Sequence, residues 1–126
     1  MEGLIDTSVL IGSEQGRPIA AHPRNAAISV MTLAELHAGV LAARDASTRA
    51  RRLQTLSDVE HAFDALPVDP RVARRFAELV TALKEHGRRM PVVDLLIAAT
   101  ASAHGLALYT QDGDFEGLPG LDVVQV

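Results

Sequence analysis

From residue 4 to residue 10 the sequence runs LIDTSVL, in which a short apolar stretch meets an acid and then two hydroxyl residues. The apolar stretch before Asp6 is typical of a short buried strand that ends at the acid. The hydroxyls of Thr7 and Ser8 can cap a helix, and Gly12 is a plausible helix end. The segment therefore predicts a strand, a turn that carries a carboxylate, and a short helix over residues 7–12.

The same alternation of short strands and helices continues along the chain. Apolar periodicity predicts strands at residues 26–30, 66–68, 106–109 and 121–124, and helices at 32–41, 47–63, 70–85 and 94–101. Residues 13–25 carry turn signals, with a helical tendency only at 19–21. Thr32 and Glu35 match the capping box that begins many helices. The alternation predicts an α/β fold, with a parallel sheet covered by helices.

Length and composition narrow the class of protein. The chain has 126 residues and no Cys, so we expect a single domain over residues 1–126. The absence of Cys excludes disulfides, zinc–thiolate sites and thiol nucleophiles. No apolar run approaches the ~20 residues of a membrane span, and the N-terminus lacks the basic region of a secretory signal. We therefore expect a soluble cytoplasmic protein without a membrane partner.

Charge is distributed unevenly. The net charge of −4 argues against a generic nucleic-acid coat protein. However, residues 44–89 hold ten basic residues against seven acids, whereas residues 90–126 hold five acids and no Lys or Arg. Arginine suits phosphate because its planar fork binds two oxygens, although for any single cluster a solvated helix face that pairs with Glu and Asp is the simpler explanation. The candidate phosphate contacts are Arg49, Arg51, Arg52, Arg88 and Arg89.

Acidic residues stand at corresponding ends of the predicted elements. Asp6 ends the first strand, and the strand at 106–109 is followed by Asp112 and Asp114. Asp94 opens the most apolar helix, and Glu35 lies in the first turn of the helix after the second strand. Sites in parallel sheets form at the carboxyl ends of the strands, so these acids are predicted to meet. Taken singly, each acid could instead serve as a cap or a turn residue.

Clustered carboxylates repel one another and raise each other's pKa values. A hard divalent cation relieves this repulsion, and ligation by oxygen alone favours Mg²⁺ or Mn²⁺. Such an ion can activate a water and polarise a phosphoryl oxygen. The sequence has no convincing Ser–His pair and no glycine-rich phosphate loop of either common type. Metal-assisted hydrolysis is therefore the simplest chemistry.

Four segments resemble, in order, the four motifs of PIN-domain proteins. They are IDTSVL (5–10), TLAEL (32–36), VDLLIAATA (93–101) and LYTQDGDF (108–115). More narrowly, the chain resembles the VapC toxins of prokaryotic type II toxin–antitoxin pairs. The resemblance runs from residue 4 to about residue 118. It implies a PIN fold, which has a parallel sheet of four or five strands with helices on both sides.

The resemblance also implies an activity and a set of site residues. PIN-domain toxins of this type are Mg²⁺- or Mn²⁺-dependent endoribonucleases that act on RNA, are commonly homodimeric, and are inhibited by a cognate VapB-like antitoxin. By motif, the acidic site is formed by Asp6, Glu35, Asp94 and Asp112. Asp6 and Asp94 correspond to the metal ligands. The auxiliary positions are Thr7, Thr110 and Asp114, and the last of these is an alternative or a companion to Asp112.

Two other classes of function stay open at this point. The chain could be a PIN-like protein that binds RNA or a partner with little or no catalysis. A phosphotransfer domain with Asp6 as nucleophile is disfavoured, because residue 8 is Ser rather than a second Asp and Lys84, the single lysine, follows no strand. An antitoxin could cover the apolar stripe of Leu36, Val40 and Leu41, unless that stripe belongs to the chain's own core.

Overall fold

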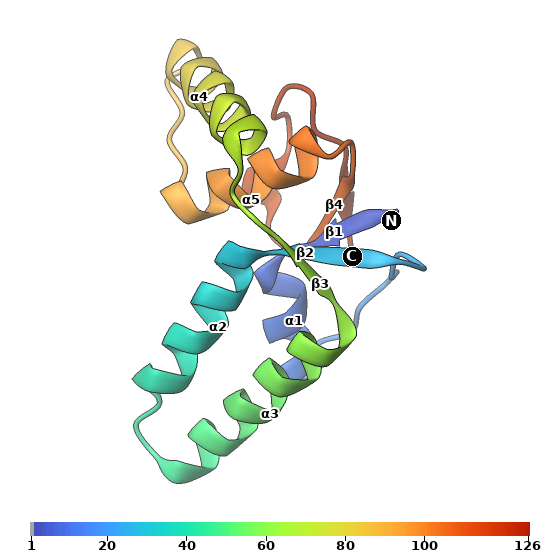
Figure 1. The fold of residues 1–126 in the computed structure, drawn as a ribbon, viewed down its shortest axis with the longest axis vertical. Coiled ribbons are helices and arrows are strands. Elements are labelled where there is room, and N and C mark those ends of the chain that lie inside the picture. The colour runs from blue at the N-terminus through green and yellow to red at the C-terminus, as the bar shows by residue number, and fades with distance from the viewer. Residues whose placement is uncertain (1) are drawn as a thin grey trace.

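The computed structural model describes residues 2–126 and contains a five-stranded parallel sheet, in the order β3-β2-β1-β4-β5 (Figure 1). The strands are β1 (Gly3–Ile5), β2 (Ala26–Ser29), β3 (Asp64–Leu66), β4 (Ala107–Thr110) and β5 (Val123–Gln125). The helices are α1 (Thr7–Glu14), α2 (Val30–Ala42), α3 (Ala46–Ala62), α4 (Pro70–Glu85) and α5 (Val92–Ala103), together with the 3₁₀ turn η1 (Gly113–Phe115). The predicted α/β fold with a parallel sheet and helices on both sides is confirmed.

Alternation of side chains along the strands creates two cores. On β1, Leu4 faces one core and Ile5 the other, and on β2 the same holds for Ala27 and Ile28. One core packs the sheet against α4 and α5, and the other packs it against α1, α2 and α3. Figure 1 shows these two groups of helices on opposite sides of the sheet. Both faces of the sheet are therefore buried, as parallel sheets require.

Local sequence explains where the helices begin. Asp45 accepts a 2.8 Å hydrogen bond from the backbone of Thr48 at the start of α3. Asp69 caps α4 in the same way, with Pro70 as the first helical residue. These backbone donors hold the pKa of both aspartates below the ordinary value. The predicted cap and proline at the start of α4 are confirmed.

The capping box predicted for the second helix is wrong. Helix α2 begins two residues earlier, at Val30, and its N-cap is Ser29, which accepts a 3.0 Å hydrogen bond from the backbone of Met31. Thr32 is consequently a buried residue inside the first turn, and the side chain of Glu35 is free for other contacts. A serine can cap a helix as well as a threonine can, so the sequence pattern alone could not decide between Ser29 and Thr32 as the N-cap.

Several predicted boundaries also shift. Residues 19–21 form no helix, and Asp94 is the third residue of α5 rather than its first. The strand expected at 66–68 lies at Asp64–Leu66, because β3 pairs in register with β2 through Ala65 opposite Ile28. The last strand begins at Val123, two residues later than predicted. Among residues 2–126, no helix is both long enough and apolar enough to span a membrane.

Candidate active site

The carboxyl edge of the sheet gathers the acids. Strand β1 is central, and its neighbours are β2 and β4. Asp6 directly follows β1, Glu35 lies on the helix that follows β2, and Asp112 lies two residues after β4. Asp94 on α5 lies close enough to these acids for their charges to raise its pKa. The edge predicted from the sequence therefore does bring together acids from four separate elements.

Asp6 is the most buried of these acids, with only 3% of its surface exposed. Its backbone N–H donates a 2.9 Å hydrogen bond to the carbonyl of Tyr109 on β4, which continues the pairing of the two strands. Its Oδ2 accepts hydrogen bonds from Ser8 at 2.7 Å and from Thr110 at 2.8 Å. Among residues 2–126 no hydrogen-bond donor contacts Oδ1, so the carboxylate is fixed through one oxygen and the other has no protein donor.

Glu35 is held by a threonine from the neighbouring helix. The Thr7 hydroxyl lies 2.8 Å from Oε1 of Glu35 and 3.0 Å from Oγ1 of Thr32. Both threonines are buried, whereas Glu35 is half-buried. Glu35 also lines a pocket of about 180 Å³ together with Glu14 and Arg52. The predicted auxiliary Thr7 therefore contacts Glu35 and restrains one of its carboxylate oxygens.

The loop after β4 is organised by Thr110 and Asp112. The Asp112 backbone N–H donates to Oγ1 of Thr110 at 2.9 Å, and the Asp112 carboxylate accepts the N–H of Asp114 at 2.9 Å. The second of these bonds caps the 3₁₀ turn η1. Asp112 is half-buried, whereas Asp114 is exposed. Geometry therefore favours Asp112 over Asp114 as the acid that belongs to the site.

The pKa of Asp94 reflects the negative charge gathered at this edge of the sheet. Its pKa is raised from 3.8 to about 6, first by burial and then by the negative charges of Asp6, Glu35, Asp112 and Asp114. The charges of the other four acids predicted for the site therefore all act on Asp94. No three acidic or His side chains of residues 2–126 are close enough to form a ready-made metal site. The oxygen-only donors instead fit a hard cation such as Mg²⁺ that keeps several waters in its shell.

Two residues of this network were missed by the sequence analysis. Ser8 joins Asp6, Thr110 (3.2 Å) and the backbone of Gln111 (3.0 Å) in one set of contacts. Thr32 was assigned to a cap but lies against Thr7 instead. The spacing of Asp6 and Ser8 is a detectable signal, since a hydroxyl two residues after an aspartate can reach its carboxylate. The contact of Thr32 has no comparable local signal.

Comparison with known proteins agrees with the fold and the motifs. A family profile described as the PIN domain matches residues 3–121. This chain belongs to the PIN-domain family. The family predicted from the four motifs is therefore confirmed, and the match covers all of the acids described above.

Several relatives of this PIN-domain chain are VapC proteins. Ribonuclease VapC5 of Mycobacterium tuberculosis is 46% identical over 126 residues, which cover 98% of this chain and 93% of that protein. Ribonuclease VapC4 of the same organism is 41% identical and is matched over 98% and 95% of the two chains. A crystal structure of a member of the VapBC family of toxin–antitoxin systems, VapBC-5 from M. tuberculosis, superposes with a TM-score of 0.89. It has 42% identity and covers 99% of this chain and 98% of that chain.

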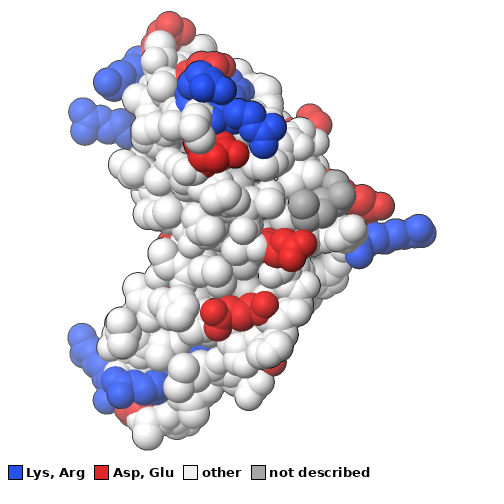
Figure 2. Space-filling model, in the orientation of Figure 1, with Lys and Arg blue, Asp and Glu red and all other residues white. Residues whose placement is uncertain are grey.

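The arginines of this PIN-domain protein fall into two groups. Arg52 donates to the carbonyl of Gly39 at 2.7 Å, and Arg49 lies 3.4 Å from that of Ala43. Arg88 donates to two carbonyls of the loop after β4. By contrast, the side chains of Arg51 and Arg89 are exposed, and neither side chain makes a hydrogen bond or ion pair with other residues of 2–126. Figure 2 shows most of the basic side chains of one face towards the ends of the molecule, away from its middle.

The apolar stripe of Leu36, Val40 and Leu41, suggested as a surface for an antitoxin, is partly buried and partly exposed. Leu36 and Val40 are buried in the core between the sheet and α3, so the internal explanation holds for them. Leu41 is 80% exposed at the end of α2, and Leu53 on α3 is 48% exposed. Of the three stripe residues, Leu41 alone is therefore exposed to another chain, and Leu53 adds apolar surface on α3.

Proposed function

We propose that this PIN-domain chain is a VapC-type endoribonuclease that hydrolyses RNA phosphodiester bonds with the help of Mg²⁺ or Mn²⁺. The observation that carries the proposal is the pKa of Asp94, raised to about 6 by burial and by four neighbouring acids. Repulsion between carboxylates at one edge of the sheet destabilises the folded chain. A bound cation would neutralise these charges and relieve the repulsion. The names of its relatives, Ribonuclease VapC5 and VapC4, support the same activity.

We assign Asp6 and Asp94 as the residues that would hold the cation. Asp6 is fixed through Oδ2 by Ser8 and Thr110, and its Oδ1 is free of protein donors within residues 2–126. When bound, the cation supplies positive charge that polarises a phosphoryl oxygen and lowers the pKa of a water. Preorganised carboxylates lose little freedom on binding, which favours affinity.

Glu35 and Asp112 are assigned to the outer part of the site. The Thr7 hydroxyl fixes one oxygen of Glu35, and the other can accept a proton or a hydrogen bond from a water. Asp112 is turned by its contact with the N–H of Asp114. The exposed Asp114 contributes this N–H, so we assign it a supporting role. Thr110 positions both Asp6 and Asp112 through one hydroxyl.

Substrate and antitoxin would use different surfaces. We assign the exposed Arg49 and Arg51 on α3, and the exposed Arg89 between α4 and α5, to RNA phosphates. A VapB-like antitoxin would cover the exposed Leu41 and Leu53 and place a basic side chain in the pocket that Glu14 and Glu35 line. The solved relative is itself a member of a toxin–antitoxin family. The homodimer stays a prediction, which sedimentation of the purified chain tests.

Cleavage of RNA by purified, antitoxin-free protein tests the proposal. Total RNA is incubated with Mg²⁺ or Mn²⁺, and the controls are EDTA and the variants Asp94→Asn and Asp122→Asn. Asp122 is an exposed acid before β5 whose side chain makes no hydrogen bond within residues 2–126. We expect discrete cleavage that EDTA and Asp94→Asn abolish and Asp122→Asn leaves unchanged. Metal and RNA binding without cleavage would instead support the binding-protein alternative.

A further inference from the structure

The segment between β4 and β5 carries Asp112 and Asp114, and two arginines hold it through main-chain carbonyls. Arg75 of α4 donates to the carbonyl of Pro119. Arg88, between α4 and α5, donates to the carbonyls of Asp114 at 3.0 Å and Glu116 at 3.3 Å. Arg88 contacts the part of the segment near Asp112, and Arg75 contacts the part near β5, farther from the acids. Both arginines belong to the basic stretch for which the sequence predicted phosphate contacts.

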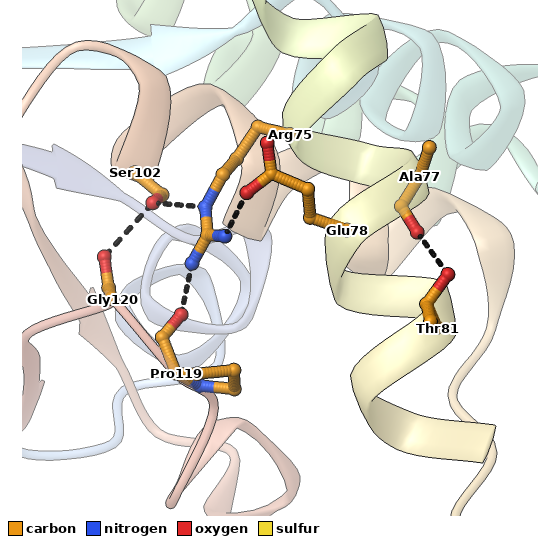
Figure 3. A network of polar contacts seen from close by, with 7 residues as sticks. All are labelled: Arg75, Ala77, Glu78, Thr81, Ser102, Pro119 and Gly120. Carbon is orange, nitrogen blue, oxygen red and sulfur yellow. Dashed lines mark hydrogen bonds and ion pairs between the residues drawn. The ribbon is translucent and has the colours of Figure 1, made fainter. Parts of the chain in front are cut away.

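The far end is attached by a connected set of polar groups (Figure 3). Nε of Arg75 donates to the Ser102 hydroxyl at 2.7 Å, and its Nη1 pairs with Glu78 at 2.8 Å. Ser102 in turn donates to the carbonyl of Gly120 at 2.8 Å. Only 19% of the Arg75 side chain is exposed. Helices α4 and α5 are thereby joined to the end of the acid-bearing segment that lies farthest from the site.

The near end is attached by the fork of Arg88. Its backbone N–H donates to the carbonyl of Leu83 at 2.8 Å, which fixes the residue against the end of α4. Nη1 and Nη2 then bind two different carbonyls, an arrangement that a lysine ammonium on its flexible stem does not reproduce. Since these nitrogens already bind the protein, Arg88 is poorly placed to serve as a phosphate contact.

The contacts continue from Arg88 to the acids. Arg88 donates to the carbonyl of Asp114, and the backbone N–H of Asp114 donates to the carboxylate of Asp112 at 2.9 Å. The Asp112 N–H reaches Thr110 at 2.9 Å, and Thr110 reaches Asp6 at 2.8 Å. From the other side, Gln125 of β5 donates to the carbonyl of Asp112 at 3.2 Å. Arg88 therefore acts on the same short loop that sets the direction of the Asp112 side chain.

We propose that Arg88 is a positioning residue that places Asp112 for the reaction, with Arg75 anchoring the far end of the same segment. The effect of Arg88 on catalysis rests on the proposed function. The clamp, by which we mean the two hydrogen bonds from Arg88 to the carbonyls of Asp114 and Glu116, does not depend on that function. It reassigns a basic residue from substrate binding to the organisation of an acidic loop. A misplacement of about 1 Å in such a loop is enough to slow a reaction substantially.

The test compares Arg88→Lys with Arg88→Gln, and uses Arg74→Gln as the matched control. Arg74 is an exposed arginine on α4 whose side chain makes no hydrogen bond or ion pair within residues 2–126. Lysine keeps the positive charge that a phosphate contact needs but loses the bridge between two carbonyls. It is also the milder change, which keeps the test usable if Arg88→Gln does not fold.

The first measurement is amide hydrogen exchange in the metal-free protein without RNA. The amides of Asp114 and Glu116 are the informative ones, because both are hydrogen-bonded within the loop. We expect Arg88→Lys to exchange about tenfold faster at these two amides, which is roughly the contribution of hydrogen bonds from a charged donor. In Arg88→Lys, amide exchange in the two cores should equal that of the unsubstituted protein. In the control Arg74→Gln, the melting temperature should also be unchanged. Unaltered exchange at both amides would overturn the clamp.

The second measurement separates kcat from KM in RNA cleavage. For a positioning residue we expect kcat to fall about tenfold in both variants, with KM within about twofold and no rescue by lysine. A raised KM that lysine restores would show a phosphate contact and overturn the proposal. If the unsubstituted protein does not cleave RNA, the proposed function fails, whereas the exchange experiment still decides whether Arg88 clamps the loop.

Discussion

The Thr110 hydroxyl donates a 2.8 Å hydrogen bond to Oδ2 of Asp6, although 104 residues separate them in the sequence. The contact follows from the sheet, in which Ile5 of β1 pairs with Tyr109 of β4. The next residue of each strand therefore lies at the carboxyl edge, one as an acid and the other as its donor. A short parallel pairing in the core thus determines how the most buried acid is oriented.

Replacing Thr110 with valine should disturb the site more than the fold. Thr110→Val keeps the shape of the buried side chain but removes the donor to Asp6 and the acceptor of the Asp112 N–H. We expect Mn²⁺ affinity to fall about tenfold, because supporting hydrogen bonds tune ligands by that order. The matched control is Thr100→Val on α5, whose buried hydroxyl only contacts the helix carbonyl of Leu96. Equal metal affinity in the two variants, measured by calorimetry, would contradict the role of Thr110.

Asp94 should make the metal-free protein less stable as the pH rises. Its folded-state pKa of about 6 lies above its ordinary value of 3.8, so the folded chain binds more protons than the unfolded chain between these values. The stability due to this group is therefore present below about pH 4 and is lost as the pH rises through 6. We expect Asp94→Asn to be stabilised by about 1 kcal/mol at pH 7.5, after allowance for solvent screening, and to gain little at pH 4.

Denaturant unfolding at the two pH values, in EDTA, measures this difference. Addition of Mg²⁺ or Mn²⁺ should raise the melting temperature of the unsubstituted protein but not that of Asp94→Asn, because a ligand stabilises the state that binds it. The same stabilisation in both proteins would remove Asp94 from the set of ligands.

Arg51 and Arg52 are neighbours in the sequence, but they should behave differently on substitution. Arg51→Gln removes an exposed charge, so we expect weaker RNA binding with a smaller salt dependence and an unchanged fold. Arg52→Gln removes the 2.7 Å bond to the carbonyl of Gly39 that ties α3 to α2, and should cost about 1 kcal/mol of stability. Binding isotherms at several salt concentrations and chemical denaturation distinguish them. A stable Arg52→Gln protein with weakened RNA binding would reverse this assignment.

Phe115 should link the stability of the core to the acidic loop. Its side chain is fully buried in the core formed with α4 and α5, directly after Asp114 in η1. Phe115→Leu should lower the free energy of unfolding by about 1–2 kcal/mol, because it leaves a small cavity. The variant Leu79→Val in the same core is the comparison, since Leu79 is equally buried but lies on α4. Faster exchange at the Asp114 amide is expected for Phe115→Leu alone.

The sequence predicted elements well where the pattern was long or carried a cap. The cap at Asp69 and the proline after it located the start of α4, and the apolar run around Asp94 located α5. It failed for short or ambiguous signals. The capping pattern of Thr32 and Glu35 predicted the wrong start for α2. The actual N-cap is Ser29, because the pairing of β2 with its neighbours decides where the strand ends. The strand near residue 66 was displaced for the same reason, because register is set by the partner strand.

The sequence by itself determined the class of fold, the family and which acids were candidates, because hydrophobic periodicity and residue spacing are local properties of the chain. Only the tertiary structure decided that Thr7 contacts Glu35, that Ser8 and Thr110 share Oδ2 of Asp6, and that Arg88 binds the loop of Asp112. These contacts join residues up to 104 positions apart. Their geometry depends on strand order and on the packing of both faces of the sheet, and neither can be read from neighbouring residues.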